Sequence, residues 1–216
     1  MNKHLATSSA EVSVDPGVYA KGKSRAVEIL KVATELLIEN GYSKLSMRSV
    51  AHAAGISLGN LQHYYPTKDA LIKQMLDYVL EDYLAFFDEI HVKALTPEQE
   101  LIDCISVVIR DLNKRETTHF FPEIWSIANH EPHFVDFMDA MYESWRSVII
   151  GIIPSINPDL NEKQVRRLAL FITASIEGHT PFIGYGKPWT RETEAIQRMA
   201  SESFLWMIKH GDIPAD

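Results

Sequence analysis

Residues 46–71 read SMRSVAHAAGISLGNLQHYYPTKDAL, and this stretch predicts two short helices joined by a tight turn. Ser46 and Ser57 each precede a short helical pattern, and serine is a preferred helix N-cap. Gly55 lies between the two segments and permits the positive φ of a tight turn. Pro66 disfavours helix at the residue before it. This is the layout of a helix-turn-helix, in which the first helix crosses the DNA backbone and the second lies in the major groove.

The second helix is expected to turn Ile56, Leu61 and Tyr65 inward and a small or hydrogen-bonding set outward. Base edges specify a DNA sequence, whereas phosphate contacts fix the register. Arg48, Tyr64 and Lys68 are therefore expected at phosphates. The alternative for each residue is plain solvent exposure. The predicted DNA-binding residues are Ser46, Met47, Arg48, Ser57, Leu58, Gly59, Asn60, Gln62, His63, Tyr64 and Lys68. Three further cations before the first helix are equally consistent with phosphate contact or with solubility: Lys21, Lys23 and Arg25.

The charge distribution supports DNA contact at the N-terminal part only. The whole chain has 216 residues and a formal net charge of −8. Residues 1–76 carry nine Lys or Arg and six Asp or Glu, a net charge of +3, and the remainder carries −11. Such an asymmetry suggests that a polyanion meets the N-terminal segment.

Helical periodicity continues through the rest of the chain, with no alternating strand pattern and no internal repeat. Thr67 and Thr96 are expected N-caps, and Pro154 is expected to stop a helix. The predicted fold is all-α with about nine helices. The predicted domains are a flexible arm over residues 1–20, a helix-turn-helix DNA-binding domain over 21–67, and a ligand-binding and dimerisation domain over 68–216. The expected helices cover residues 24–40, 47–54, 58–65, 68–90, 97–114, 117–130, 132–153, 161–182 and 191–210.

The stretch quoted above resembles the DNA-binding signature of TetR-family transcriptional regulators, and the strong resemblance covers roughly residues 24–76. The chain departs from the family pattern at Gln62, where Tyr is usual, and at Tyr64-Tyr65, where His-Phe is usual. The resemblance implies a homodimeric, ligand-responsive repressor whose last two long helices form a four-helix dimer interface. Apolar residues expected at that interface, or alternatively in the internal core, are Leu168, Ala169, Phe171, Ile172, Ala174, Ser175, Ile176, Ala195, Ile196, Met199, Phe204, Leu205 and Met207.

Aromatic and sulfur-containing side chains cluster in the middle helices, where they could line an apolar ligand pocket. The alternative is ordinary core packing. Polar residues within the same apolar segments either pair with each other or await a ligand, because a buried polar group is costly unless it is paired. The predicted ligand-binding residues are Cys104, Phe121, Trp125, Asn129, His130, Met138, Met141, Trp145, Glu177 and His179.

Several other classes of protein fit the sequence poorly. No apolar run is long enough to span a membrane, and the sequence lacks both a secretory signal and a second cysteine for a disulfide, so we expect a cytoplasmic protein. His130-Glu131-Pro132-His133 has the wrong spacing for a helical zinc site, so no metal is expected. No cofactor motif is present, and no enzyme activity is expected; the alternative enzyme would use Glu177 and His179 as an acid/base pair.

We therefore expect a sequence-specific transcriptional regulator that binds double-stranded DNA as a homodimer, without membrane contact. A small, partly apolar effector would release it from a palindromic operator. An activator with the same DNA contacts, or an adaptor whose helix-turn-helix binds a protein, remains an alternative.

Overall fold

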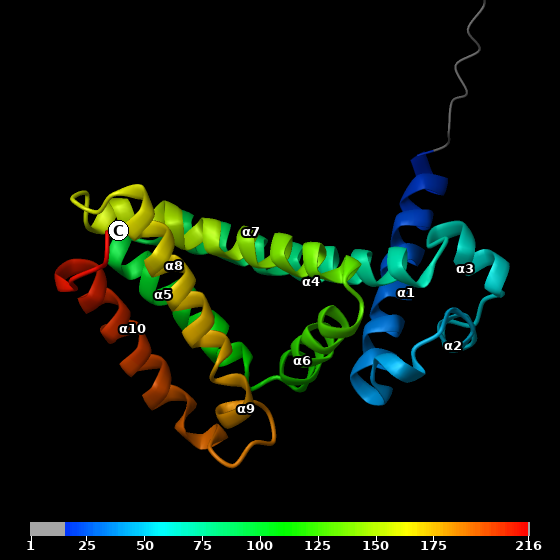
Figure 1. The fold of residues 1–216 in the computed structure, drawn as a ribbon. Coiled ribbons are helices and arrows are strands. Elements are labelled where there is room, and N and C mark those ends of the chain that lie inside the picture. Colours follow the sequence, from blue (N-terminus) through cyan, green and yellow to red (C-terminus); the bar gives the residue numbers. More distant parts are fainter. Residues whose placement is uncertain (1–15, 216) are drawn as a thin grey trace, which may run out of the picture.

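The computed structural model describes residues 16–215, with side chains from residue 24 onward except at position 133. Its helices follow one another along the chain without interruption by other regular elements (Figure 1). Their bounds are α1 Pro16–Asn40, η1 Tyr42–Lys44, α2 Met47–Ala53, α3 Leu58–Tyr64, α4 Lys68–Lys93, α5 Pro97–Asp111, α6 Arg115–His130, α7 His133–Ile156, α8 Glu162–Glu177, α9 Thr180–Ile183, η2 Thr190–Glu192 and α10 Thr193–His210, where η denotes a short 3₁₀ helix.

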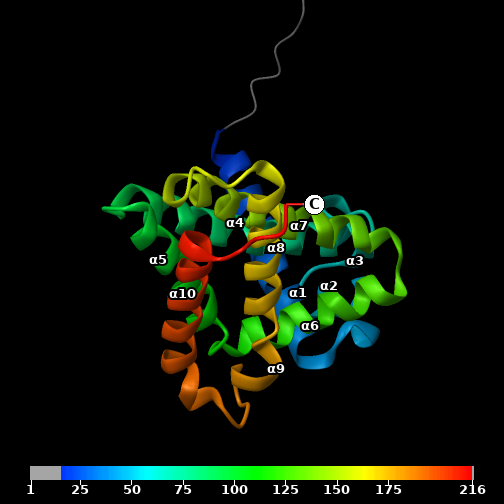
Figure 2. The same cartoon turned by 60° about the vertical axis from the view of Figure 1, so that its left-hand side comes forward.

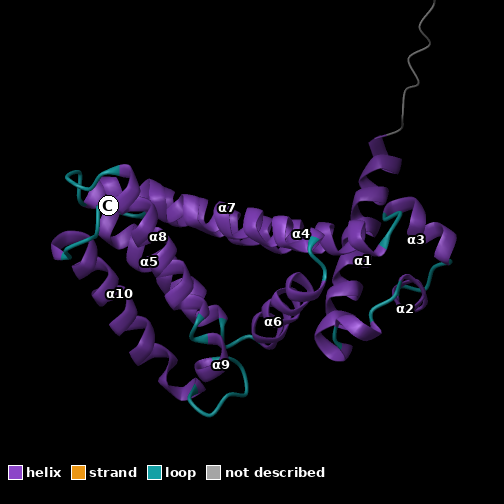
Figure 3. Cartoon of the chain, in the orientation of Figure 1, coloured by secondary structure: helices purple, strands orange, loops and turns teal. Residues whose placement is uncertain are grey.

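The predicted all-α fold is confirmed: residues 16–215 contain helices, turns and loops but no strand (Figure 3). The predicted caps are present as well. The side chains of Ser46, Ser57, Thr67 and Thr96 each accept a hydrogen bond from the backbone N–H three residues later. Such caps satisfy an otherwise unpaired N–H of the first turn, which is why the helix starts could be located from sequence.

Several helix bounds differ from the prediction, and three of these differences concern the predicted arm or a proline. Helix α1 already begins at Pro16, and residues 1–15 of the predicted arm lie outside the described residues. Pro154 does not stop its helix: α7 continues to Ile156. A proline this close to the end of a helix removes only one of the last intrahelical hydrogen bonds. The predicted helix over 161–182 is divided at Gly178, since Pro181 has no N–H to offer to the carbonyl of Glu177.

Two apolar cores occupy the two ends of the molecule. The N-terminal core joins α1, α2, α3 and the first half of α4 to α6 and the start of α7. The C-terminal core joins α5, α8 and α10 to the end of α4 and the second half of α7. Helices α4 and α7 pack side by side and link the two ends (Figures 1 and 2). Helix α4 thus begins in the N-terminal core and ends in the C-terminal core.

The turn between α2 and α3 depends on Gly55. Its φ is +65°, and a Cβ there would meet no atom within 4 Å, so only backbone conformation opposes a side chain. We expect Gly55→Ala to lower the free energy of unfolding by about 1–2 kcal/mol, the cost of a left-handed L-residue. Gly59→Ala is the matched control: Gly59 lies inside α3 with equal space, and alanine should stabilise that helix by about 0.5–1 kcal/mol. Urea unfolding measures both, and equal effects would contradict the role given to Gly55.

Candidate DNA interface and ligand cavity

The two helices of the helix-turn-helix are held at their N-termini by serine caps. Ser46 forms a capping box with Ser49: the N–H of Ser49 donates to Ser46 Oγ over 3.1 Å, and the N–H of Ser46 donates to Ser49 Oγ over 2.9 Å. The N–H of Asn60 donates to Ser57 Oγ over 3.1 Å. Both hydroxyls predicted at the DNA thus already accept a capping hydrogen bond.

The buried side of α3 packs against α1. Leu61 and Tyr65 are buried, as predicted, and the Tyr65 hydroxyl donates to the carbonyl of Ala26 over 3.0 Å. Arg25 Nη2 donates to the carbonyl of Ala54 over 2.7 Å, at the end of α2. Arg25 therefore has a structural contact with the turn, whereas the side chains of Lys21 and Lys23 lie outside the described ones.

The side of α3 that is predicted to contact DNA is largely exposed to solvent. Gly59, Asn60, Gln62 and His63 on α3 are exposed, and so is Arg48 on α2. Four other residues of the predicted set are half-buried, namely Met47, Leu58, Tyr64 and Lys68. The side chains of Met47 and Tyr64 pack against the N-terminal core, which leaves only part of each available to DNA.

Lys68 has an internal partner that its position in the sequence did not reveal. Its ammonium donates to the carbonyl of Tyr42 over 3.1 Å and lies 3.5 Å from the centre of the Tyr42 ring. Burial lowers the pKa of Lys68. The contact fixes the start of α4 to η1, and a phosphate contact by Lys68 would require the ammonium to leave this carbonyl.

A cavity opens between the two cores, bounded by α4, α5, α6, α7 and Glu177 of α8. Its volume is about 40 Å³, and the empty space reaches about 530 Å³ only when the open mouth to solvent is included. Four predicted ligand residues line it: Phe121, Met141, Trp145 and Glu177. The remaining lining residues were not among the predicted set and are Val79, Leu80, Tyr83, Phe87, Val108, Leu112, Thr117 and Tyr142.

The other predicted ligand residues lie elsewhere. Trp125, Asn129 and Met138 line a neighbouring groove, which shares Glu177 and Tyr142 with the cavity. The structure does not bring three residues to the cavity: Cys104 is fully buried in the C-terminal core, His130 is exposed at the end of α6, and His179 follows Gly178 beyond the end of α8. Because Glu177 lines the cavity and His179 does not, the acid/base pair of the alternative enzyme is not assembled there.

Two hydrogen-bonded clusters border the cavity. At one side, Asp111 Oδ2 accepts from Thr117 Oγ1 over 2.6 Å and from the hydroxyl of Tyr83. At the other, Trp125 Nε1 donates to the Tyr142 hydroxyl over 2.7 Å, and Tyr142 is hydrogen-bonded to Glu177. Thr117 is a polar residue at the start of a predicted helix with apolar spacing. This position was the one sequence signal that could have indicated the first cluster.

Burial raises the pKa of the Glu177 carboxyl to about 7, although the hydrogen bond from Tyr142 opposes the shift. The unfolded chain ionises this group above about pH 4.5, whereas the folded chain retains the proton up to about pH 7. Its contribution to stability is therefore fully present below pH 4.5 and is lost as the pH rises through 7.

Glu177→Gln is expected to remove this dependence. Between pH 5 and pH 8 the variant should gain stability relative to the parent chain, by at most about 3 kcal/mol. Chemical unfolding at a series of pH values measures the difference. Glu202→Gln, at an exposed position of α10, is the control and should show no such trend. A pH-independent difference for Glu177→Gln would contradict the shifted pKa.

The described residues contain neither a membrane-spanning helix nor a cluster of metal-binding side chains. No helix combines the length and the apolarity needed to cross a lipid bilayer. No group of three or more His, Cys, Asp or Glu side chains within the described part lies close enough together to hold a metal ion.

Comparison with known proteins places the helix-turn-helix in a family. Residues 29–75 match the model of bacterial regulatory proteins of the tetR family. The chain is 26% identical over 122 residues to the HTH-type transcriptional regulator PksA of Bacillus subtilis, covering 56% of this chain and 58% of PksA. It is 33% identical over 81 residues to the HTH-type transcriptional repressor KstR2 of Rhodococcus jostii, covering 37% and 40%. The matched segments thus span about half the length of these curated relatives.

Solved structures extend the similarity of the fold beyond the N-terminal domain. A transcriptional regulator from Rhodococcus sp. Rha1 superposes with a TM-score of 0.70 at 21% identity, covering 88% of this chain and 99% of that one. A TetR transcription regulator from Haloarcula marismortui gives a TM-score of 0.64 at 20% identity, covering 88% and 96%. The helix-turn-helix segment, residues 29–75, thus matches the tetR family of bacterial regulatory proteins, and the fold of the chain is shared with solved structures of transcriptional regulators.

Proposed function

We propose that this chain is a sequence-specific, DNA-binding transcriptional regulator that acts as a repressor in the cytoplasm. The observation that carries the proposal is the capped, glycine-linked pair α2–α3 with an exposed polar face, within the segment that matches the family model. Arg48 is the proposed phosphate contact, and Asn60 and Gln62 are the proposed base contacts.

Exposed apolar side chains support a homodimer formed by α8 and α10. Leu170 and Phe171 on α8, and Met199 and Trp206 on α10, are each at least half exposed. Met199 and Trp206 lie seven residues apart and therefore share one face of α10. Five residues of the predicted interface are instead core residues, because their side chains point into the subunit: Leu168, Ala169, Ile172, Ile176 and Phe204. A two-fold dimer would bind two half-sites of a palindrome.

The position of the cavity supports control of DNA binding by a small molecule. Helix α4 carries Leu71 and Met75 in the N-terminal core, and Val79 and Tyr83 in the cavity wall. A ligand that displaces this wall would change the separation of the two recognition helices in a dimer. It would act only as far as it binds the DNA-free state more tightly than the DNA-bound state.

Helix α6 offers a second connection between cavity and DNA-binding unit. Its residues Thr117 and Phe121 line the cavity, while Glu123 Oε2 accepts from the N–H of Tyr42 over 2.9 Å. The carbonyl of the same Tyr42 accepts from Lys68 at the start of α4. Movement of α6 would therefore act on the base of the helix-turn-helix as well.

Selection of random duplexes by the purified chain tests the proposal. We expect a palindromic sequence with half-site centres one helical turn apart, or a multiple of that spacing. Transcription from a promoter carrying that sequence, measured with and without the chain, distinguishes repression from activation. Failure to enrich any sequence at low salt would overturn the proposal.

A further inference from the structure

One residue that lines the cavity has a buried hydrogen-bond donor without a protein partner. Trp145 lines the cavity and is only 7% exposed, and its Nε1 has no acceptor among the described residues. The ring cannot readily turn to find one, because it stacks on Phe87 with centroids 4.6 Å apart and planes at 18°. A buried donor without an acceptor is costly, so an incoming acceptor atom would gain more here than at a hydrated site.

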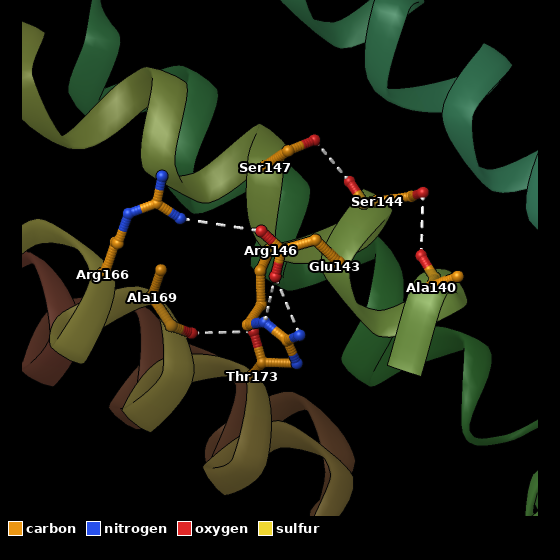
Figure 4. A network of polar contacts seen from close by, with 8 residues as sticks. All are labelled: Ala140, Glu143, Ser144, Arg146, Ser147, Arg166, Ala169 and Thr173. Carbon is orange, nitrogen blue, oxygen red and sulfur yellow. Dashed lines mark hydrogen bonds and ion pairs between the residues drawn. The ribbon is translucent and has the colours of Figure 1, made fainter. Parts of the chain in front are cut away.

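The wall also lacks positive charge. No Lys, Arg or His is among the residues that line the cavity, whose surface is formed mainly by apolar and aromatic side chains. Two adjoining grooves each contain one basic residue, and both are paired: the guanidinium of Arg146 is bound by Glu143 over 2.9 Å (Figure 4), and the ammonium of Lys114 is bound by Asp111. An anion entering the cavity would leave water without gaining a cationic partner, which is strongly unfavourable.

The single acidic group of the wall is a poor partner for a cation. The Glu177 carboxyl is hydrogen-bonded to Tyr142, whose hydroxyl also accepts from Trp125. Burial favours the protonated carboxyl, so a cationic ligand would have to induce its ionisation. Asp111 is likewise engaged, with Thr117 and Tyr83. A neutral molecule requires neither ionisation of Glu177 nor release of Asp111 from its hydrogen bonds.

We propose that the cavity binds a neutral, largely apolar molecule that carries an acceptor oxygen of the carbonyl type, and that this oxygen accepts a hydrogen bond from Trp145 Nε1. The assignment rests on the proposed function in one respect only, namely that the occupant of the cavity is the effector.

Four naphthalene probes of similar size test this chemistry by calorimetry on the DNA-free chain. They are 2-acetylnaphthalene as the neutral acceptor, 2-ethylnaphthalene without an acceptor, 2-naphthoate as the anion and 2-naphthylmethylammonium as the cation. We expect the ketone to bind about tenfold more tightly than the hydrocarbon, the gain from pairing a buried donor. The anion and the cation should each bind at least about tenfold more weakly than the ketone, because both must be desolvated.

Trp145→Phe tests the assigned donor. The variant should lose the preference for the ketone over the hydrocarbon, and hydrocarbon binding by the same variant measures any change in packing. Trp125→Phe is the matched control, since the indole N–H of Trp125 already donates to Tyr142. This control should retain the preference. If Trp145→Phe does not fold, the ratio of the four affinities for the parent chain still decides the proposal.

Several results would overturn the inference. They are equal binding of ketone and hydrocarbon, tightest binding of the anion, or tightest binding of the cation with that preference lost in Glu177→Gln. A separate measurement concerns the effector role: displacement of the chain from its selected duplex by the ketone. Selective binding without displacement would contradict ligand control as proposed above, while leaving the chemistry of the cavity intact.

Discussion

Arg48→Ala is expected to weaken binding to every duplex sequence and to flatten its dependence on salt. Arg48 is exposed on α2, where it is placed to contact a phosphate. Each lost phosphate contact reduces the slope of log K against log salt by about 1, so a dimer should lose about 2. Gel shifts between 50 and 200 mM salt measure the slope. Arg110→Ala, an exposed cation on α5, is the control and should leave it unchanged.

Asn60→Ala is expected to act differently, although Asn60 belongs to the same motif. A lost base contact should cost about 1–3 kcal/mol of discrimination at one base pair of each half-site, with little change in the salt slope. Competition between the selected duplex and its single-base variants measures the loss. If both substitutions change only the overall affinity, or if neither has an effect, the separation of phosphate and base contacts is wrong.

The combined variant Phe171→Glu and Trp206→Glu is expected to be a monomer that binds the selected duplex at least about 100-fold more weakly. The two side chains are 50% and 60% exposed on α8 and α10, so charges there should oppose association rather than folding. Two linked half-site contacts gain from effective concentration, and this gain is lost when the subunits separate.

Sedimentation velocity and gel shifts measure the two effects of this variant, and circular dichroism checks that it remains helical. Val92→Glu is the control: Val92 is 82% exposed on α4, outside the proposed interface, and its replacement should affect neither mass nor DNA binding. A dimer that survives the double substitution would exclude α8 and α10 as the interface.

The sequence alone determined the features that depend on neighbours along the chain. Serine and threonine caps, the glycine turn and apolar spacing located the helix-turn-helix and most helix starts, because caps and turns are set within a few residues. The signature within residues 46–71 was sufficient to indicate the family that the comparisons then supported. Local signals were weaker at helix ends: Pro154 looked like a stop and is inside α7.

Only the tertiary structure decided which polar groups meet. Glu123 reaches Tyr42 across 81 residues, and Lys68 donates to the same Tyr42 rather than lying free. Glu177 and His179 are two residues apart, yet only Glu177 lines the cavity, because α8 ends between them. Helical periodicity defines which residues share a face, but the partner of that face depends on long-range packing, which no local pattern encodes.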